Sequence, residues 1–379
     1  MLINFWYAAE LAGSLRDKPV KVRLLGQNFV LFRDSHGLAR CLSNVCIHRC
    51  ASLADGWVTG DRVVCPYHGW EFAGSGQCQR IPSLGPGQAP VPARVRVDSY
   101  PVQERYGIVF VFLGDLPEAE RPPLMAVPEW DQPGWRCTTS EFSLKANYRR
   151  VVENALDPAH AEYVHVVGRR GQNPEYSVPA YDVLETEWGA GMEVRFRSQA
   201  GGFWKHFRDQ SRETVAGTTF HGPSQFVTRI HIDRKMSVYQ YAFDTPVDLF
   251  TTRSFLVSAR NFFTAPLFDF VSERQNRVIV EEDRRVIEHL EPTVPFENST
   301  ADFSVKADAI QLCYRRKLKE WESRGWRIDT VSLAAVPPGT GLHVIPSPGR
   351  RDARGWQFPT VPLLAAAEPS GEDRVSRAG

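Results

Sequence analysis

Two short segments near the start of the chain each pair a cysteine with a histidine, and they constrain the fold more than any other feature. One residue separates Cys46 from His48, and two residues separate Cys65 from His68. Two thiolates on one iron and two imidazoles on the other define a [2Fe-2S] cluster of the Rieske type, which has a raised reduction potential. The spacing therefore predicts one such cluster bound by Cys46, His48, Cys65 and His68.

A structural zinc site is the alternative, because two Cys and two His also satisfy a tetrahedral zinc ion. Zinc sites of this composition usually separate a Cys pair from a His pair. Here each segment contributes one residue of each kind. This arrangement favours two irons, one bound by Cys46 and Cys65 and the other by His48 and His68.

A second metal site is indicated by His160 and His165. Two His and one carboxylate form the facial triad of non-haem ferrous iron, which leaves positions open for O2. Five residues along a regular helix place two side chains about 140° apart. Both histidines can therefore bind one iron only if the helix ends or is distorted between them. Two unrelated histidines on one helix are the alternative.

These segments together resemble a known family. Residues 46–49, 65–70 and 153–160, with His165, resemble the oxygenase (alpha) component of Rieske non-haem iron aromatic-ring-hydroxylating oxygenases. The resemblance extends from Asn4 to about Leu364. Residues 245–253, 311–321 and 345–348 resemble the demethylase-like, homotrimeric branch. Cys50 departs from the pattern, because the family often has Gly there; an extra thiol beside the cluster is an oxidation liability.

The third ligand of the second site is assigned from this resemblance. In residues 278–288 the family's ligand aspartate precedes a basic pair, which implies Asp283. Glu281, Glu282 and Asp269 remain competitors on position alone. A solvated helix face with ion pairs four residues apart is the alternative without a metal.

Three further residues are expected to support the two sites. Asp157 precedes His160 by three residues, so its carboxylate is expected to accept the second ring N–H of that histidine. The resemblance implies that Asp157 also faces His68 of the adjacent subunit and carries electrons between protomers. The alternative is that the Asp157 carboxylate lies at a helix N-terminus and only interacts favourably with the helix dipole. Asn154 and Glu153 are expected in the same hydrogen-bond network.

The pattern of strands and helices predicts an α+β chain. Short alternating runs such as 19–25, 28–32 and 108–113 predict an all-β Rieske [2Fe-2S] domain over 1–117, and a proline-rich connector follows over 118–140. Helical periodicity begins after Ala146, and 189–263 reads as long antiparallel strands. We expect a catalytic domain over 141–364, with a curved sheet covered by helices (the helix-grip type), and a disordered tail over 365–379.

The substrate pocket is the least constrained feature. Apolar side chains on the expected long strands are predicted to form core or pocket wall: Met192, Val194, Phe196, Phe207, Phe220, Phe226, Val238, Tyr241 and Phe243. Four cationic or titratable residues are candidates to clamp a substrate carboxylate, with ordinary core or surface roles as the alternative: His206, His221, Arg229 and His231.

Composition agrees with an enzyme of the cytoplasm. The net charge of +1 argues against nucleic acid or membrane surfaces as partners. Seven Cys, two of them expected ligands, do not suggest a disulfide framework. No run approaches the ~18 apolar residues of a membrane helix.

The resemblance also implies the activity. We expect a terminal oxygenase that takes electrons from an external NAD(P)H-dependent reductase or ferredoxin. It would use O2 to hydroxylate or oxidatively demethylate a hydrophobic, aromatic small molecule. Cis-dihydroxylation and desaturation remain alternatives. A Rieske ferredoxin needs only the first third of the chain and leaves the second site unexplained. The chain has no Gly-rich dinucleotide fingerprint, so we expect NAD(P)H to bind the reductase.

Overall fold

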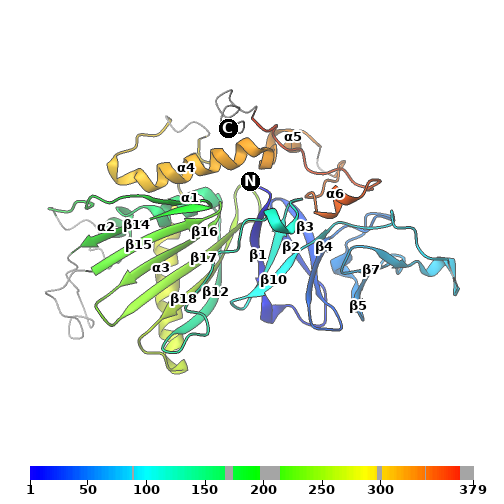
Figure 1. Cartoon of the computed structure of the whole chain (residues 1–379), viewed down its shortest axis with the longest axis horizontal. Helices are drawn as coiled ribbons and strands as arrows, with labels where there is room; N and C mark the ends of the chain where they lie inside the picture. Colours follow the sequence, from blue (N-terminus) through cyan, green and yellow to red (C-terminus); the bar gives the residue numbers. More distant parts are fainter. Residues whose placement is uncertain (88, 167–173, 197–213, 297–300, 338, 368–379) are drawn as a thin grey trace, which may run out of the picture.

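The computed structural model describes residues 1–87, 89–166, 174–196, 214–296, 301–337 and 339–367. Figure 1 shows two parts side by side: a group of small sheets formed by the first third of the chain, and one large sheet with helices packed on it. Among the described residues, no helix combines the length and the apolar character needed to cross a membrane.

The first part is built from three small antiparallel sheets, as the alternating sequence predicted. In β2 the buried residues Val22 and Leu24 alternate with the exposed Lys21 and Arg23. One sheet has the order β1-β11-β10, the second β2-β3-β4-β9 and the third β5-β6-β7-β8. The strands are β1 (Phe5–Leu11), β2 (Val20–Leu24), β3 (Gln27–Arg33), β4 (Ala39–Ser43), β5 (Trp57–Thr59), β6 (Arg62–Val64), β7 (Glu71–Ala73), β8 (Cys78–Arg80), β9 (Ser99–Tyr100), β10 (Val102–Arg105) and β11 (Ile108–Leu113).

The second part contains a seven-stranded sheet of antiparallel neighbours, ordered β12-β18-β17-β16-β15-β14-β13. Its strands are β12 (Arg136–Leu144), β13 (Leu184–Thr186), β14 (Gly189–Phe196), β15 (Thr214–His221), β16 (Gln225–His231), β17 (Ser237–Pro246) and β18 (Thr252–Arg260). The helices are α1 (Tyr148–Leu156), α2 (His160–Val164), α3 (Asp269–Ile287), α4 (Ala309–Trp321), α5 (Thr330–Ala334) and α6 (Gly349–Asp352). This arrangement confirms the predicted α+β class.

The two faces of the large sheet bury different partners. Tyr241 and Phe243 of β17 point toward the first part of the chain, where Phe243 packs against Phe110 with ring centroids 4.9 Å apart. Ala242, between them, points to the opposite face and joins the core under the helices. We call the latter the helix face of the sheet. Because both faces are covered, these strands are apolar on both sides.

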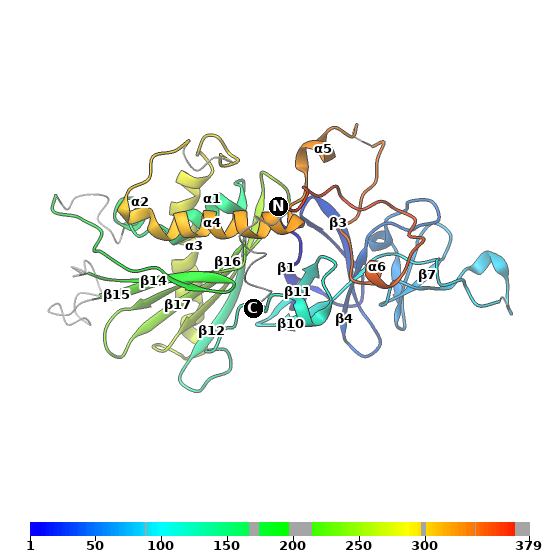
Figure 2. The same cartoon turned by 45° about the horizontal axis from the view of Figure 1, so that its top comes forward.

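The described residues that follow α4 return to the first part (Figure 2). The Ile328 N–H donates to the carbonyl of Met1 over 3.0 Å. The Tyr100 hydroxyl donates to the carbonyl of Ile345 over 2.7 Å, and Arg350 forms an ion pair with Asp98 at 2.7 Å. The domain expected over 141–364 therefore includes a segment that contacts the first domain. Of the tail expected over 365–379, residues 368–379 lie outside the described part.

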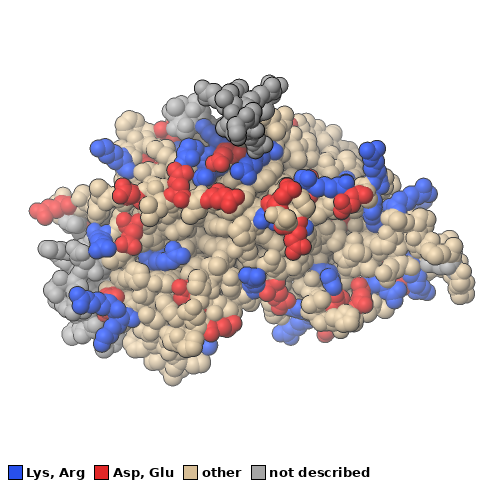
Figure 3. Space-filling view, viewed as in Figure 1, with Lys and Arg blue, Asp and Glu red and all other residues tan. Residues whose placement is uncertain are grey.

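Charged side chains of both signs are interspersed over the face of the molecule shown in Figure 3. This distribution agrees with the net charge of +1. Among the described residues, that face therefore carries no large patch of one sign.

Candidate metal centres

The two segments that contain the Cys and His pairs form loops with the same backbone hydrogen bonds. In the first ligand loop, residues 46–51, the Cys46 N–H donates to the carbonyl of Ala51 and the Cys50 N–H to that of Cys46, both over 2.9 Å. In the second ligand loop, residues 65–70, the equivalent bonds join Cys65 to Trp70 over 2.8 Å and Gly69 to Cys65 over 3.0 Å. Two matching turns thus present the four predicted ligands.

Cys50 and Gly69 occupy equivalent positions in these loops. Their φ angles are +57° and +71°, both in the left-handed region that favours glycine. This explains why the sequence pattern has Gly at Gly69 and why Cys50 is an unusual residue. The Cys50 side chain is exposed, as an oxidation-prone thiol would be.

The donor atoms in the two loops fit a [2Fe-2S] cluster. The rings of His48 and His68 lie with centroids 4.5 Å apart, and His48 stacks on Trp70 at 4.6 Å. The Nδ1 atom of His48 is buried without a hydrogen-bond partner. A hydrogen bond between the thiols lowers the pKa of Cys65 to about 6 and raises the pKa of Cys46. A readily formed thiolate and an unpaired imidazole nitrogen are suitable ligands for iron.

The geometry does not fit a single zinc ion. In the part of the chain that the structure describes, three ligand atoms from different residues come within 4.8 Å of one another at one place, formed by His160, His165 and Asp283. No three of the four residues in the ligand loops meet this condition. Four ligands around one zinc ion would have to converge this closely, since each lies about 2.0–2.3 Å from the metal.

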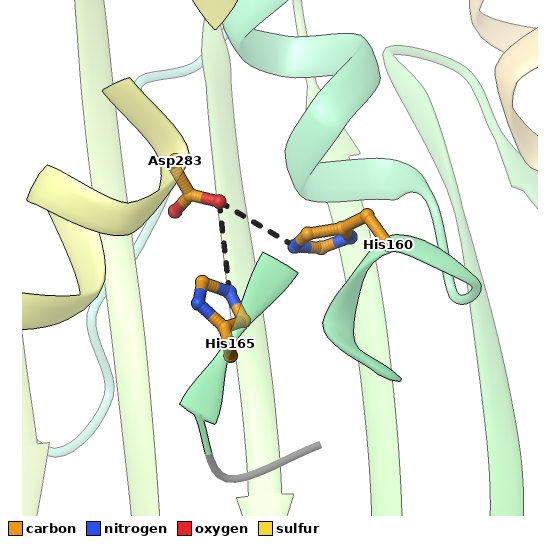
Figure 4. A group of neighbouring side chains, drawn as sticks. All are labelled: His160, His165 and Asp283. Carbon is orange, nitrogen blue, oxygen red and sulfur yellow. Dashed lines mark ion pairs between the residues drawn. The ribbon is translucent and has the colours of Figure 1, made fainter. Parts of the chain in front are cut away.

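The second site lies where α1, α2 and α3 meet (Figure 4). Asp283 Oδ1 is 3.7 Å from Nε2 of His160 and 3.5 Å from Nε2 of His165. His160 begins α2, and the helix ends at Val164, so His165 has extended backbone with φ −90° and ψ 140°. This helix end between the two histidines is the condition that the five-residue spacing required.

Both histidines are oriented by hydrogen bonds at Nδ1. The Nδ1 of His165 contacts Oε2 of Glu282 at 3.0 Å, and the Nδ1 of His160 contacts the backbone carbonyl of Asp157 at 2.5 Å. A carboxylate or carbonyl accepts from Nδ1–H, which leaves Nε2 of each ring free to bind a metal. The donor set, two imidazole nitrogens and one carboxylate oxygen, fits ferrous iron.

The expected role of the Asp157 carboxylate within the chain is wrong. Asp157 ends α1 with extended backbone (φ −78°, ψ 114°), as expected for a residue before proline. This conformation turns its carbonyl toward His160. Its carboxylate Oδ1 instead accepts from the N–H of Ala159 over 2.7 Å.

The competing carboxylates have other partners. Glu282 is buried and contacts Nδ1 of His165, the ring nitrogen that does not face Asp283. Glu281 pairs with Arg284 at 3.4 Å. Asp269, at the start of α3, pairs with Arg136 at 2.5 Å and with Arg260 at 2.6 Å. Of these four acidic residues, Asp283 alone reaches Nε2 of both histidines. The sequence offered Glu282 as a competing ligand and gave no indication of its supporting role.

The predicted support from α1 is partly present. Asn147 caps this helix by accepting from the N–H of Arg149 over 3.0 Å. From α1, Asn154 Nδ2 donates to Oδ1 of Asp283 over 3.0 Å. Glu153 does not join this network, because its carboxylate pairs with Arg315 of α4 at 2.8 Å.

The residues suggested as pocket walls divide between the two faces of the sheet. Met192, Val194, Phe220 and Phe226 belong to the core on the helix face. Val238, half-buried, pairs with Ile230 on that face. Tyr241 and Phe243 lie on the opposite face. Phe207 and the side chain of Phe196 lie outside the described residues.

The three described candidates for a carboxylate clamp, His221, Arg229 and His231, do not lie on the helix face. Arg229 and His231 alternate with residues of the helix face and lie beside Tyr239, on the side away from Asp283. The Nε2 of His221 contacts the carbonyl of Pro123 at 2.7 Å, and burial lowers its pKa. His206 lies outside the described residues.

Comparison with known proteins identifies two domains in this chain. Residues 5–101 match the Rieske [2Fe-2S] domain, and residues 144–324 match the vanillate O-demethylase oxygenase C-terminal domain. The chain therefore contains the two domains of the Rieske oxygenase family. In this family the first domain carries a [2Fe-2S] cluster and the second a mononuclear iron.

Among curated relatives of this chain, the 4beta-methylsterol monooxygenase of Methylococcus capsulatus is 39% identical over 166 residues, which cover 43% of this chain and 44% of the relative. The oxygenase component of dicamba O-demethylase from Stenotrophomonas maltophilia is 34% identical over 187 residues, covering 48% and 51%. The matched part therefore spans about half the length of these relatives.

Solved structures share the fold at lower identity. Dicamba monooxygenase bound to 3,6-dichlorosalicylic acid superposes with a TM-score of 0.72 at 23% identity, over 89% of this chain and 99% of the other. NdmA of Pseudomonas putida CBB5 with caffeine gives 0.72 at 22% identity, over 84% and 90%. These likenesses extend across both parts of the chain.

Proposed function

We propose that this chain is the terminal oxygenase component of a Rieske-type system. It takes electrons from a separate NAD(P)H-dependent reductase or ferredoxin and uses O2 to hydroxylate or oxidatively demethylate a hydrophobic, aromatic small molecule. The observation that carries the proposal is the presence in one chain of the two ligand loops and the site formed by His160, His165 and Asp283.

The residues of the second site prepare it for such chemistry. Glu282 and the Asp157 carbonyl hold the rings so that both Nε2 atoms face Asp283 Oδ1. Three ligands from one side leave other coordination positions available. When both cofactors are bound, the cluster supplies electrons and the mononuclear iron supplies the O2 chemistry. The protein's part is to orient the substrate and keep the ligands in place.

Demethylation or monooxygenation is favoured over cis-dihydroxylation and desaturation. The C-terminal match is to a vanillate O-demethylase domain. The relatives named above are a methylsterol monooxygenase and a dicamba O-demethylase. We place the chain in the cytoplasm, where NAD(P)H is available to the reductase and the thiols of Cys46 and Cys65 stay reduced.

Electron paramagnetic resonance of anaerobic, dithionite-reduced protein exposed to nitric oxide tests both metal sites. We expect a Rieske signal together with a high-spin ferrous-nitrosyl signal. His165→Ala should remove the second signal and keep the first. His289→Ala is the matched control, because the exposed ring of His289 contacts the Arg285 carbonyl and belongs to neither candidate metal site. A Rieske signal alone from iron-replete wild type would refute the oxygenase proposal.

Part of this proposal is a homotrimer in which electrons pass between protomers through Asp157. His68 and Tyr67 of the second ligand loop are exposed. Tyr163 and Val166, beside the second site, are each 59% exposed. Docking of one protomer's ligand loop beside α2 of the next would cover these apolar side chains and bring His68 near Asp157.

Two substitutions separate this electron route from local structure. Asp157→Asn keeps an oxygen that can accept from the Ala159 N–H but removes the charge, whereas Asp157→Ala removes both. Reoxidation of the cluster in a single turnover, followed by stopped flow, should slow by at least about tenfold in both variants. A rate near wild type in Asp157→Asn would mean that the carboxylate only caps the turn.

A further inference from the structure

The helix α3 presents three polar residues toward the sheet and the second site at intervals of seven residues: Asp269, Asn276 and Asp283. Seven residues are nearly two full turns, so these side chains share one face and are about 10.5 Å apart along the axis. Asp283 faces the histidines, and Asp269 pairs with Arg136 and Arg260. Asn276, between them, is 4% exposed.

Asn276 contacts a polar row that crosses the helix face of the sheet. Strand register places Thr218 opposite Thr228, Thr228 opposite Gln240, and Gln240 opposite Ser258. Gln240 Nε2 donates to Oδ1 of Asn276 over 3.0 Å and to the Ser258 hydroxyl over 3.1 Å. A sheet face buried under helices is ordinarily lined by apolar side chains. A row of buried polar side chains on this face therefore needs an explanation.

The contact between Gln240 and Asn276 leaves hydrogen-bonding capacity unused. Oε1 of Gln240 and Nδ2 of Asn276 are both buried without a partner, as is the hydroxyl of Thr218 on the same row. If the oxygen and nitrogen positions of both side-chain amides were exchanged, the pair would still have one donor and one acceptor without a partner. Leaving a buried polar atom without a hydrogen-bond partner is unfavourable, so a bound group that pairs with these atoms would stabilise the site.

We propose that Gln240 and Asn276 form the specificity subsite for the substrate, and that the group recognised there is a neutral amide or lactam. This inference rests on the proposed oxygenase function. An amide edge supplies one acceptor and one donor, which pair with the free atoms of the two side chains. A carboxylate supplies acceptors alone and would face an unpaired carbonyl oxygen. Asn276 and Asp283 are about 10.5 Å apart along the α3 axis, which is comparable with the length of an aromatic ring with its substituents.

An acid-bearing substrate is the rival. The described cations on the helix face nearest to this row, Arg136 and Arg260, share the carboxylate of Asp269 two turns farther from Asp283. Arg260 keeps one buried nitrogen, Nη1, without a partner. Gln240 and Asn276 lie between that arginine pair and the second site, so they would meet a compact substrate first.

Matched amide and acid pairs test the proposal. The probes are 4-methoxybenzamide with 4-methoxybenzoate, and 6-methoxy-2-naphthamide with 6-methoxy-2-naphthoate, titrated by calorimetry into the anaerobic holoenzyme. We expect at least one amide to bind about tenfold or more tightly than its acid, since one mismatched buried hydrogen bond has about that effect. Binding of the acids as tightly as the amides, or no binding of either amide, would overturn the proposal.

Variants connect the preference to these two residues. Gln240→Leu and Asn276→Leu should each reduce the amide preference to less than about threefold. The matched control is Gln311→Leu, because Gln311 on α4 also has a buried Oε1 without a partner but contacts the carbonyl of Glu153. Rieske signal intensity and iron content report whether each variant is folded. A preference that persists in both leucine variants of the subsite contradicts the assignment.

The outcomes also distinguish this inference from the proposed function. Calorimetric binding does not depend on turnover. Protein that shows both resonance signals but prefers the acids keeps the oxygenase function and loses the amide subsite. Protein that prefers the amides but gives no ferrous-nitrosyl signal keeps the subsite and loses the oxygenase assignment.

Discussion

Asn154 Nδ2 donates a 3.0 Å hydrogen bond to Oδ1 of Asp283, the same oxygen that faces both histidine rings. This bond joins α1 to α3 at the second site. Asn154→Ala should therefore release Asp283 and lower the affinity for Fe(II) by about 10–100-fold, as loss of a residue that orients a metal ligand typically does. Iron content relative to the Rieske signal measures this. An unchanged ratio would show that packing alone positions the carboxylate.

Glu282 should act through His165 rather than bind the metal. Glu282→Ala removes the acceptor for Nδ1 and should weaken Fe(II) binding by about 10–100-fold. Glu282→Gln retains an oxygen that can accept this bond and should stay within about threefold of wild type. Glu281→Ala, one residue earlier, is the control, because Glu281 forms an ion pair with Arg284 and does not face the histidines. Equal losses in Glu282→Gln and Glu282→Ala would instead favour a ligand role for the charge.

Substitutions at Cys50 and Gly69, the two residues with positive φ in the ligand loops, should change the free energy of unfolding in opposite directions. Cys50→Gly relieves a positive φ and should raise the free energy of unfolding by up to about 1 kcal/mol. Gly69→Ala should lower it by about 1–2 kcal/mol, because φ is +71° and the new Cβ would lie 3.1 Å from Cγ of Pro82. Thermal unfolding followed by cluster absorbance measures both. Destabilisation by Cys50→Gly would mean that the thiol makes a compensating contact.

Stability should depend on pH through Asp244. Burial raises the pKa of this carboxyl to about 7, with the neighbouring Ser254 hydroxyl opposing the rise. The folded protein thus binds a proton more tightly than the unfolded chain, whose carboxyl titrates near 4. The resulting stabilisation is complete below pH 4 and is lost as the pH rises toward 7.

Asp244→Asn should remove this dependence. The unfolding midpoint of the variant should exceed that of wild type by more at pH 8 than at pH 5.5, with a difference in unfolding free energy of about 2–4 kcal/mol at the higher pH. The unfolding midpoints of both proteins, measured at both pH values, test this prediction. A difference in unfolding midpoint that is the same at both pH values would show that Asp244 does not titrate in this range.

Sequence reasoning succeeded where chemistry is local. The spacing of Cys46, His48, Cys65 and His68 is confined to two short loops, and the five-residue interval between His160 and His165 required the helix end that the structure contains. Asp283, more than a hundred residues away, came from resemblance, because position in a helix does not separate it from Glu282.

Other expectations failed for physical reasons. The carbonyl of Asp157 faces His160 because Pro158 forces extended backbone, which a helical spacing rule ignores. Arg229 and His231 were candidates to clamp a substrate carboxylate, but they lie on the other face of the sheet and have the alternative, ordinary roles. Alternation shows that neighbours point opposite ways, but when both faces are buried it does not show which face meets the helices.

The packing of Phe110 on Phe243 has a consequence for how the molecule can be taken apart. Ile108, Phe110 and Phe112 are fully buried, and the sheet of the second domain supplies part of their cover. A fragment containing only the electron-carrying third would expose this apolar surface to water and tend to aggregate. Cluster bleaching and loss of sheet structure should therefore coincide on heating, as in a single cooperative unit. Joining the first domain to a different second domain would therefore require redesign of the apolar interface between them as well as of the connecting segment.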